Sequence, residues 1–296
     1  MTVPTDPSRT VARAELTLTL YLAEPLHWAH EGAASLLQAF LAVVPAEFLT
    51  RFATSRTQRW LSVDRSRQQE LGELLKLPWS ESVPRHLFRL DVVDDPHCPS
   101  CGFSYLEIDP ARSECAGVVE ITLPQEFDAG YLLPIARAAL AAGPLYSGVG
   151  GYGVRMNQAY LADAFDIAWA WSRRFPGLDI QFPERMAWHA PQGLPGTNWL
   201  TFIGAPVAER FRFDLGQAER HPWVDPMITT ERVGDNLMVI AGETPTTGDR
   251  HHFDSLAAYR EVATTTQKLL VKHPPTLPSC LLDEHADQAW FRRLCI

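Results

Sequence analysis

Alternating hydrophobic and polar residues predict a strand near the start of the chain. In the segment "LTLTLYL", residues 16–22, every second residue is leucine, and threonine or tyrosine stands between the leucines. This period of two is typical of a half-buried strand. Apolar residues at helical spacing then predict a helix over residues 30–43, which Pro45 ends. Because "EFLTRFAT" has the pattern of a further strand, the three segments form a strand–helix–strand unit.

The same order of elements recurs later in the chain. The segment "VVEITLP", residues 118–124, alternates as a strand does, and a helix is expected over residues 130–142, before Gly143 and Pro144. The glycine-rich segment "LYSGVGGYGV" follows. The recurrence leaves open an old duplication, which would give two related strand–helix–strand lobes.

The second half of the chain continues to alternate strands with helices. Helices are expected over residues 156–174, 205–211 and 255–271, and "TNWLTFIG" has the pattern of a short strand. Two strands around Val233-Gly234-Asp235-Asn236 form a predicted hairpin, whose second strand is apolar on both faces and therefore central in its sheet. Strands joined by hairpins and by helices favour an α+β fold, with helices packed on a mainly antiparallel sheet.

Length and composition limit the domain organisation and the setting. The 296 residues contain no Gly- or Ser-rich linker, so we expect one domain over residues 16–296, preceded by a flexible, polar segment over residues 1–15. The N-terminus lacks the apolar core of a signal peptide, and no apolar run approaches the ~20 residues of a membrane span. The cysteines are five, an odd number, and we expect them to be reduced in a cytoplasmic protein.

A glycine motif raises the question of a nucleotide. Gly148, Gly150 and Gly153 spell the G-x-G-x-x-G pattern of dinucleotide-binding loops. That motif needs a strand before the loop and a helix that begins in it, so that the pyrophosphate meets the helix N-terminus. Here a predicted helix precedes the glycines, and no acidic residue follows in the required setting. We therefore expect the glycines to serve the fold, by a bulge or a close backbone approach.

Three cysteines form a candidate structural zinc site. Cys98 and Cys101 stand in the C-x-x-C segment "CPSC", and Cys115 follows. A tetrahedral site lacks its fourth ligand, because no second paired motif is present. A thioredoxin-like dithiol would need a helix beginning at the first cysteine, where a strand is expected instead. The preferred interpretation is a plain loop with no metal and no redox role.

A histidine cluster supplies the alternative enzymatic reading. Asp249, His251, His252 and Asp254 lie in the segment "GDRHHFD" and could serve a metal-dependent hydrolase. No helical H-E-x-x-H pairing accompanies them, and the chain has no G-x-S-x-G, P-loop or S-x-x-K motif. A polar loop that caps the final helix is the preferred interpretation. We therefore expect no catalytic residue and no cofactor.

The charge balance points to a basic partner. The formal net charge of −9 argues against direct binding to a nucleic-acid backbone, which requires a basic patch. An acidic surface attracts a basic protein and raises the rate of encounter. Acidity alone is also explained by solubility.

Four phrases in the second half of the chain resemble a known family. They are "RRFPGLDI", "GTNWLTFIGAPVAERF", "NLMVIAGETPTTGD" and "YREVATTTQKL". In this order they resemble the type VI secretion immunity family, and the resemblance extends over residues 16–270. Where many members have two glycines after the "NWLTF" helix, this chain has "RFRFDLGQ".

The resemblance implies a non-enzymatic antitoxin that binds and blocks a cognate secreted effector. Effectors of this kind include nucleases, and a nuclease presents a basic groove to DNA that an acidic protein can occupy. We therefore expect stoichiometric occlusion of the effector, with no contact to membrane or nucleic acid. Glu243 and Asp249, on the loop after the central strand, are the first candidate contacts. Asp91, Asp94 and Asp95 in "LDVVDDPHC" form the second acidic candidate.

Overall fold

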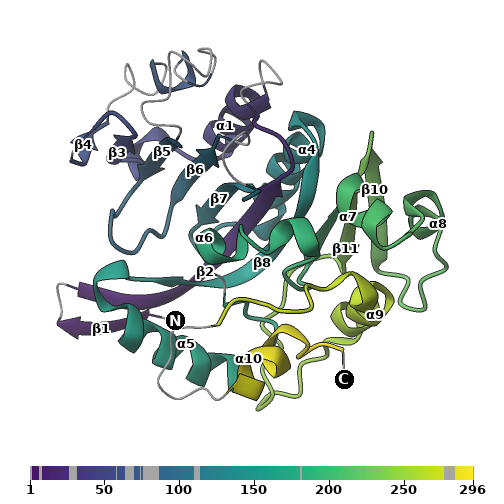
Figure 1. The fold of residues 1–296 in the computed structure, drawn as a ribbon. Coiled ribbons are helices and arrows are strands. Elements are labelled where there is room, and N and C mark those ends of the chain that lie inside the picture. The colour runs from purple at the N-terminus through teal and green to yellow at the C-terminus, as the bar shows by residue number, and fades with distance from the viewer. Residues whose placement is uncertain are drawn as a thin grey trace.

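One antiparallel sheet of eleven strands runs through the part of the chain that the structure describes (Figure 1). The structure is a computed structural model and describes residues 2–6, 9–26, 32–57, 59–63, 70–73, 75, 87–109, 114–180, 182–276 and 284–295. The strands are β1 Thr2–Asp6, β2 Arg9–Leu22, β3 Arg51–Thr54, β4 Leu61–Ser62, β5 Leu87–Val93, β6 Gly102–Ile108, β7 Gly117–Leu123, β8 Leu145–Met156, β9 Leu200–Gly204, β10 Ile228–Val233 and β11 Asn236–Ala241.

The strands lie in the order β10-β11-β9-β8-β2-β7-β6-β5-β3-β4, and β1 pairs with β2. All of these neighbours are antiparallel. The predicted α+β fold with a mainly antiparallel sheet is therefore confirmed. The predicted hairpin is β10–β11, and its second strand lies between β10 and β9, as expected for a central strand.

Each helix that the sequence predicts is present. The described helices are α1 Gly32–Val43, α4 Leu132–Ala142, α5 Leu161–Arg174, α6 Pro183–Met186, α7 Ala205–Arg210, α8 Leu215–Glu219, α9 Ala257–Thr266 and α10 Glu284–Phe291, together with short 3-10 turns η1 Ala46–Phe48, η3 Ala129–Tyr131, η4 Gln158–Tyr160, η5 Ala190–Gln192 and η6 Gln267–Leu269. The expected start of the first helix, His30, lies outside the described residues. Both strand–helix–strand units, β2–α1–β3 and β7–α4–β8, contribute to the same sheet.

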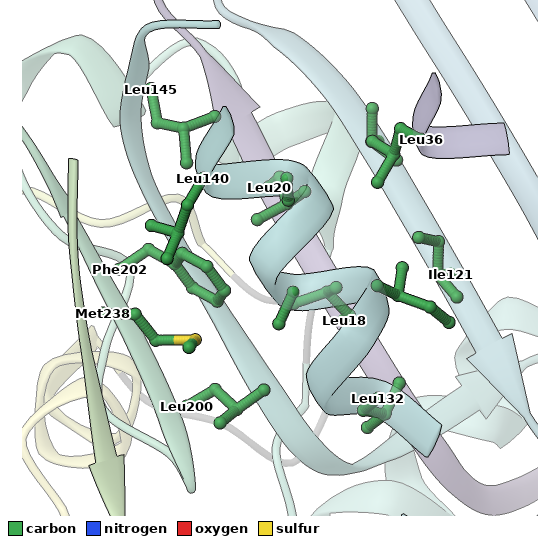
Figure 2. Packing of buried hydrophobic residues seen from close by; sticks show 14 of the residues in the cluster. Leu18, Leu20, Leu36, Ile121, Leu132, Leu140, Leu145, Leu200, Phe202 and Met238 are labelled. Carbon is green, nitrogen blue, oxygen red and sulfur yellow. The ribbon is translucent and has the colours of Figure 1, made fainter. Parts of the chain in front are cut away.

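The main core lies between the sheet and the helix pair α1 and α4, which contact each other (Figure 1). Figure 2 shows Leu18 and Leu20 of β2 beside Ile121 of β7, with Leu132 and Leu140 of α4 packed among them. The other face of β2 is buried too, because Tyr21 packs with residues of β7 and α6. The prediction of a half-buried strand is therefore wrong for β2. A strand at the centre of this sheet is covered on both sides.

The N-terminal residues do not form the flexible segment predicted over residues 1–15. Residues 2–6 form β1, and residues 9–15 form the first half of β2; residues 1, 7 and 8 lie outside the described part. Val11, Ala12 and Ala14 are buried in a second cluster with α5. The two alanines are poor strand formers, so their pattern gave little sign of a strand. That residues 16–296 form a single domain stays a prediction.

The glycine motif lies inside β8, and no helix begins in it. Gly151 has φ of 150°, and a Cβ atom there would lie 2.4 Å from Oδ1 of Asn198. The chain therefore needs a glycine at this point for both backbone conformation and space. Two glycines of the motif itself also lie close to β2: an added Cβ would be 2.8 Å from the carbonyl oxygen of Thr19 at Gly148 and 2.4 Å from Oγ1 of Thr17 at Gly153. These close approaches confirm that the glycines serve the fold.

Candidate functional site

The loop between β11 and α9 is held by an arginine clamp. Nε and Nη2 of Arg174, at the end of α5, donate to the two carboxylate oxygens of Asp249 at 2.9 and 2.7 Å. Oδ1 of Asp249 also accepts a hydrogen bond from the backbone N–H of His251 at 2.9 Å. These hydrogen bonds, that from Arg174 above all, lower the pKa of Asp249 to about 2. Asp249 is therefore a buried structural anchor. It is not the exposed contact that the sequence suggested.

Further hydrogen bonds fix the shape of the loop. The Asp254 carboxylate accepts from the backbone N–H of Asp249 at 3.1 Å. The hydroxyl of Tyr259 in α9 accepts from the N–H of Thr246 at 3.0 Å, and Gly177 donates its N–H to the carbonyl of Thr247. The polar loop does not cap α9 through Asp254, because Leu256 is the N-cap residue of that helix and Asp254 is used inside the loop. The loop is thus preformed, which lowers the entropy cost of binding.

Two of the exposed side chains of this rigid loop are candidate contacts. Glu243 is exposed, and Phe253 is 92% exposed, the largest value among the large hydrophobic residues of the described part. Phe253 also has φ of 56°, a left-handed conformation that is rare for a bulky residue. Strain of this kind is retained where the surrounding structure over-determines it, often at binding sites. The sequence pattern gave no sign of Phe253.

The geometry does not favour a metal-dependent hydrolase at this loop. Nε2 of His252 lies 3.8 Å from Asp249, but Arg174 occupies that carboxylate, and Asp254 binds backbone. His251 and His252 are exposed. Within the described residues, no group of three or more His, Cys, Asp or Glu side chains is placed to hold a metal ion.

The second acidic candidate is not an exposed patch. Asp91 is 3% exposed, and Nε of Arg89 donates to it at 2.6 Å. Asp94 closes the loop between β5 and β6, where its Oδ1 accepts from the N–H groups of Ser100 and Cys101 at 3.0 and 3.1 Å. Asp95 is partly exposed and accepts from the N–H of His97. Only Asp95 of these three stays a candidate contact.

The cysteines of the "CPSC" segment are buried thiols. Cys98 and Cys101 have no exposed surface, and Sγ of Cys98 donates to the carbonyl of Arg155 at 3.6 Å. Burial raises the pKa of Cys98 to about 11 and that of Cys101 to about 12. Burial also raises the pKa of Cys115 to about 11. Neutral thiols are poor zinc ligands and poor nucleophiles, so nothing in their setting favours the zinc or the redox reading.

A cavity of about 340 Å³ opens on the sheet face opposite α1 and α4. Its charged lining residues are engaged with one another. Arg89 contacts Asp91 and lies 3.6 Å from Glu184, and Arg155 forms an ion pair with Glu120. Strand register gathers these residues from separate parts of the chain, so the sequence pointed to Asp91 alone among them. His97, which is exposed, also lines the cavity and belongs to none of these pairs.

A second hollow, of about 440 Å³, borders the loop that carries Glu243. We call it the loop hollow; it is lined by Ala14, Gln125, Glu126, Tyr152, Pro245, Thr246 and Thr247. Glu15 lies close by, and its Oε2 accepts from the N–H of Gln125 at 2.7 Å. Burial raises the pKa of Glu15 to about 7. The loop hollow joins the β11–α9 loop to the segment that follows β7.

None of the described helices is both long enough and apolar enough to span a membrane. No curated protein matches the chain. A solved structure, the Pseudomonas aeruginosa T6SS protein PA0821, is similar to this chain with a TM-score of 0.77 and 17% identity, covering 98% of this chain and 84% of that chain. At this identity the likeness shows a shared fold.

A family model matches residues 101–294, which is more than half of the chain. Its description is type VI immunity for VRR-NUC. The match includes β7 to α9 and the whole β11–α9 loop. It confirms the resemblance carried by the four phrases of the second half of the sequence. This chain belongs to the TsiV family, the type VI immunity proteins for VRR-NUC.

Proposed function

We propose that this chain is a non-enzymatic antitoxin that binds one VRR-NUC effector and blocks access of DNA to it. The family match over residues 101–294 is the observation that carries this proposal. The proposal places the protein in the cytoplasm, where the effector would meet DNA. It requires no catalytic group and no cofactor.

The charge of the protein suits this role. A nuclease binds DNA through Lys and Arg side chains that face the phosphates, and this chain has a formal net charge of −9. Opposite charges steer two proteins toward each other and raise the association rate. An acidic protein that occupies the basic groove competes directly with DNA.

We assign part of the contact to the β11–α9 loop. Glu243 supplies a charge and Phe253 an apolar anchor, while Arg174 and Asp249 position both from within the protein. Aromatic side chains are frequent among the few residues that dominate binding energy. Asp95 is a further proposed contact, on the loop between β5 and β6.

The test is a nuclease titration with the VRR-NUC effector encoded next to the gene for this chain. DNA cleavage is measured at fixed effector as the amount of this protein rises. We expect activity to fall in a straight line to zero at one equivalent. A standard interface of about 800 Å² per partner is sufficient for such tight binding.

Cleavage that persists at a large excess of this protein would refute the proposed function. Inhibition that needs far more than one equivalent would refute the stoichiometric mechanism. Inhibition in which this protein consumes the DNA or the effector by turnover would refute it too. A neighbouring gene without a VRR-NUC product would also count against the proposal. The variant Phe253→Ala tests the contact assigned to the β11–α9 loop and should weaken inhibition. Val224→Ala, at another exposed apolar residue (89% exposed), is the control and should not.

A further inference from the structure

We propose that an exposed aromatic patch beside the loop hollow is a second part of the effector contact and docks on a basic surface of the nuclease domain. The patch consists of Phe48, Phe127 and Tyr131. This inference rests on the proposed function and adds to it the location and the chemistry of a second contact. The observations that carry it are the ring geometry, the exposure, the surrounding charge and the position next to the β11–α9 loop.

The three rings form a continuous row at the surface. The centroids of Phe48 and Phe127 are 5.3 Å apart with the planes at 82°, and those of Phe127 and Tyr131 are 6.1 Å apart at 84°. Edge-to-face contacts of this kind stabilise aromatic pairs. Phe48 is 37% exposed and Tyr131 is 45% exposed, whereas Phe127 packs against the main core. The row is therefore anchored at its centre and open at both ends.

Short turns hold the patch in place. Phe48 belongs to η1, just after α1, and Tyr131 belongs to η3, just before α4, and these two helices lie side by side (Figure 1). The N–H of Phe127 donates to the carbonyl of Pro124 at 2.9 Å. The Asp128 carboxylate caps η3 by accepting from the N–H of Gly130 at 2.8 Å. Like the β11–α9 loop, the patch is preformed, which favours tight binding.

Carboxylates surround the rings. Glu47 precedes Phe48 in the chain, and Glu126 and Asp128 flank Phe127; all three acidic residues are exposed. Among the described residues, no Lys, Arg or His side chain forms an ion pair with any of them. Arginine stacks on aromatic faces and pairs with carboxylates through two hydrogen bonds. The patch therefore fits a surface rich in arginine, such as the DNA-binding groove of a nuclease.

The patch continues the surface already assigned to the effector. Gln125 and Glu126, next to Phe127, line the loop hollow together with Pro245, Thr246 and Thr247 of the β11–α9 loop. One partner seated over the loop hollow would reach both sides. A standard interface takes about 20–30 residues from each partner, which is more than the loop over residues 242–256 contains, so a contact that includes the patch is closer to ordinary size.

The charge selects among possible occupants. A second copy of this chain, related by two-fold symmetry about the patch, would place its own Glu47, Glu126 and Asp128 near the same three residues. Like charges in close contact are repulsive by several kcal/mol at an interface. A basic partner has no such cost, and the aromatic rings add apolar burial. The occupant that fits is therefore the basic effector.

The experiment measures the affinity of the full-length chain for the VRR-NUC domain of the neighbouring effector by calorimetry. We expect Tyr131→Ala and the double variant Glu47→Lys/Glu126→Lys each to weaken binding by about tenfold or more, as hot-spot residues do. Trp188→Ala, at a residue 57% exposed, is the aromatic control. Glu209→Lys/Asp235→Lys, at two exposed residues, changes the net charge equally and controls for long-range steering. Asp128 is left intact because it caps η3.

The outcomes separate the two proposals. If the wild-type chain does not bind the VRR-NUC domain, the proposed function fails. If it binds and the patch variants bind as tightly as the controls, only the patch proposal is overturned. Patch variants that alter self-association in gel filtration but bind the effector normally would also overturn it. Circular dichroism of every variant verifies that a loss of binding is not a loss of fold.

Discussion

At the scale of single residues, the structure contains a buried carboxyl group whose pKa lies near neutral pH. Glu15 is 5% exposed, and burial raises its pKa from 4.5 to about 7, against the lowering effects of the Gln125 N–H and of Arg13. In the unfolded chain the same group titrates near its ordinary value. Folding therefore favours the protonated form. The contribution of Glu15 to stability is therefore greatest below pH 4.5 and falls as the pH rises toward 7.

We predict that Glu15→Gln removes this pH dependence. The amide oxygen can still accept from the N–H of Gln125, and glutamine has no charge to desolvate. Above pH 7 the variant should be more stable than the wild type by up to about 3 kcal/mol, and at pH 4.5 the two should be nearly equal. Urea unfolding at both pH values measures this, with Glu209→Gln, at an exposed residue, as the control. Equal stability of Glu15→Gln and the wild type at pH 8 would contradict the assignment.

The Arg174–Asp249 clamp gives a second prediction. Arg174→Ala should loosen residues 249–254 and weaken effector binding about fivefold or more, because the loop loses its preformed shape. Arg173→Ala, at the preceding exposed arginine, is the matched control. Amide hydrogen exchange of the loop measures the loosening directly. Unchanged exchange in Arg174→Ala would show that the clamp does not order the loop.

The sign of the pH dependence at this clamp is opposite to that of Glu15. The pKa of Asp249 is lowered to about 2 from 3.8, so the clamp is complete above pH 4 and is lost as the pH falls toward 2. Protection of the loop should therefore be constant from neutral pH down to about pH 4.

The sequence places Glu243 and Asp249 on the same loop, between β11 and α9, but the structure buries the Asp249 side chain. Glu243 and Asp249 were both read as contacts, because an acidic residue on a rigid loop is expected to be exposed. Burial of Asp249 depends on Arg174, which is 75 positions away in the chain. Likewise, Asp91 is exposed or buried according to the strand pairing of β5. Such partners come from tertiary structure, and a single sequence does not show them.

At the scale of elements, the sequence predicts correctly the helices and strands whose signal lies in a short stretch of the chain. The β10–β11 hairpin, the β9 strand with α7, and the helices α1, α4, α5 and α9 all follow from hydrophobic period and turn residues. The start of β2 was missed because Val11, Ala12 and Ala14 form a weak pattern, and α10 was missed altogether. α10 is short and packs through Trp290 in the cluster with α5. Its stability comes from that packing and not from its own sequence.

Gly151 of β8, compared with Gly196 outside it, gives the prediction at the scale of elements. Gly151 and Gly196 have similar φ values, 150° and 156°, but an added Cβ lies 2.4 Å from Asn198 Oδ1 at Gly151 and meets nothing within 4 Å at Gly196. Both alanine variants carry the backbone cost. Gly151→Ala should be destabilised by about 1–3 kcal/mol more than Gly196→Ala, because of the added clash. Equal melting of the two variants would show that β8 tolerates a side chain there.

At the scale of the whole molecule, the family and the charge both point to a protein partner. The sequence predicts the family, through four phrases that the match over residues 101–294 confirms, whereas Phe253 and the aromatic patch, both proposed to bind the effector, are not evident from it. The aromatic patch combines residues of η1 and η3, which are far apart in the sequence. The packing of α1 beside α4 brings these two turns together. The net charge of −9 predicts that association slows as salt rises, by about tenfold between low and high ionic strength. Stopped-flow mixing with the effector measures this rate.

The most direct test of occlusion is a DNA displacement experiment. A catalytically inactivated VRR-NUC effector is bound to fluorescent duplex DNA, and this protein is added while the fluorescence anisotropy of the DNA is measured. Occupation of the basic groove predicts that the DNA is released completely at one equivalent of this protein. A stable ternary complex, in which effector holds DNA and this protein at the same time, would contradict the central claim.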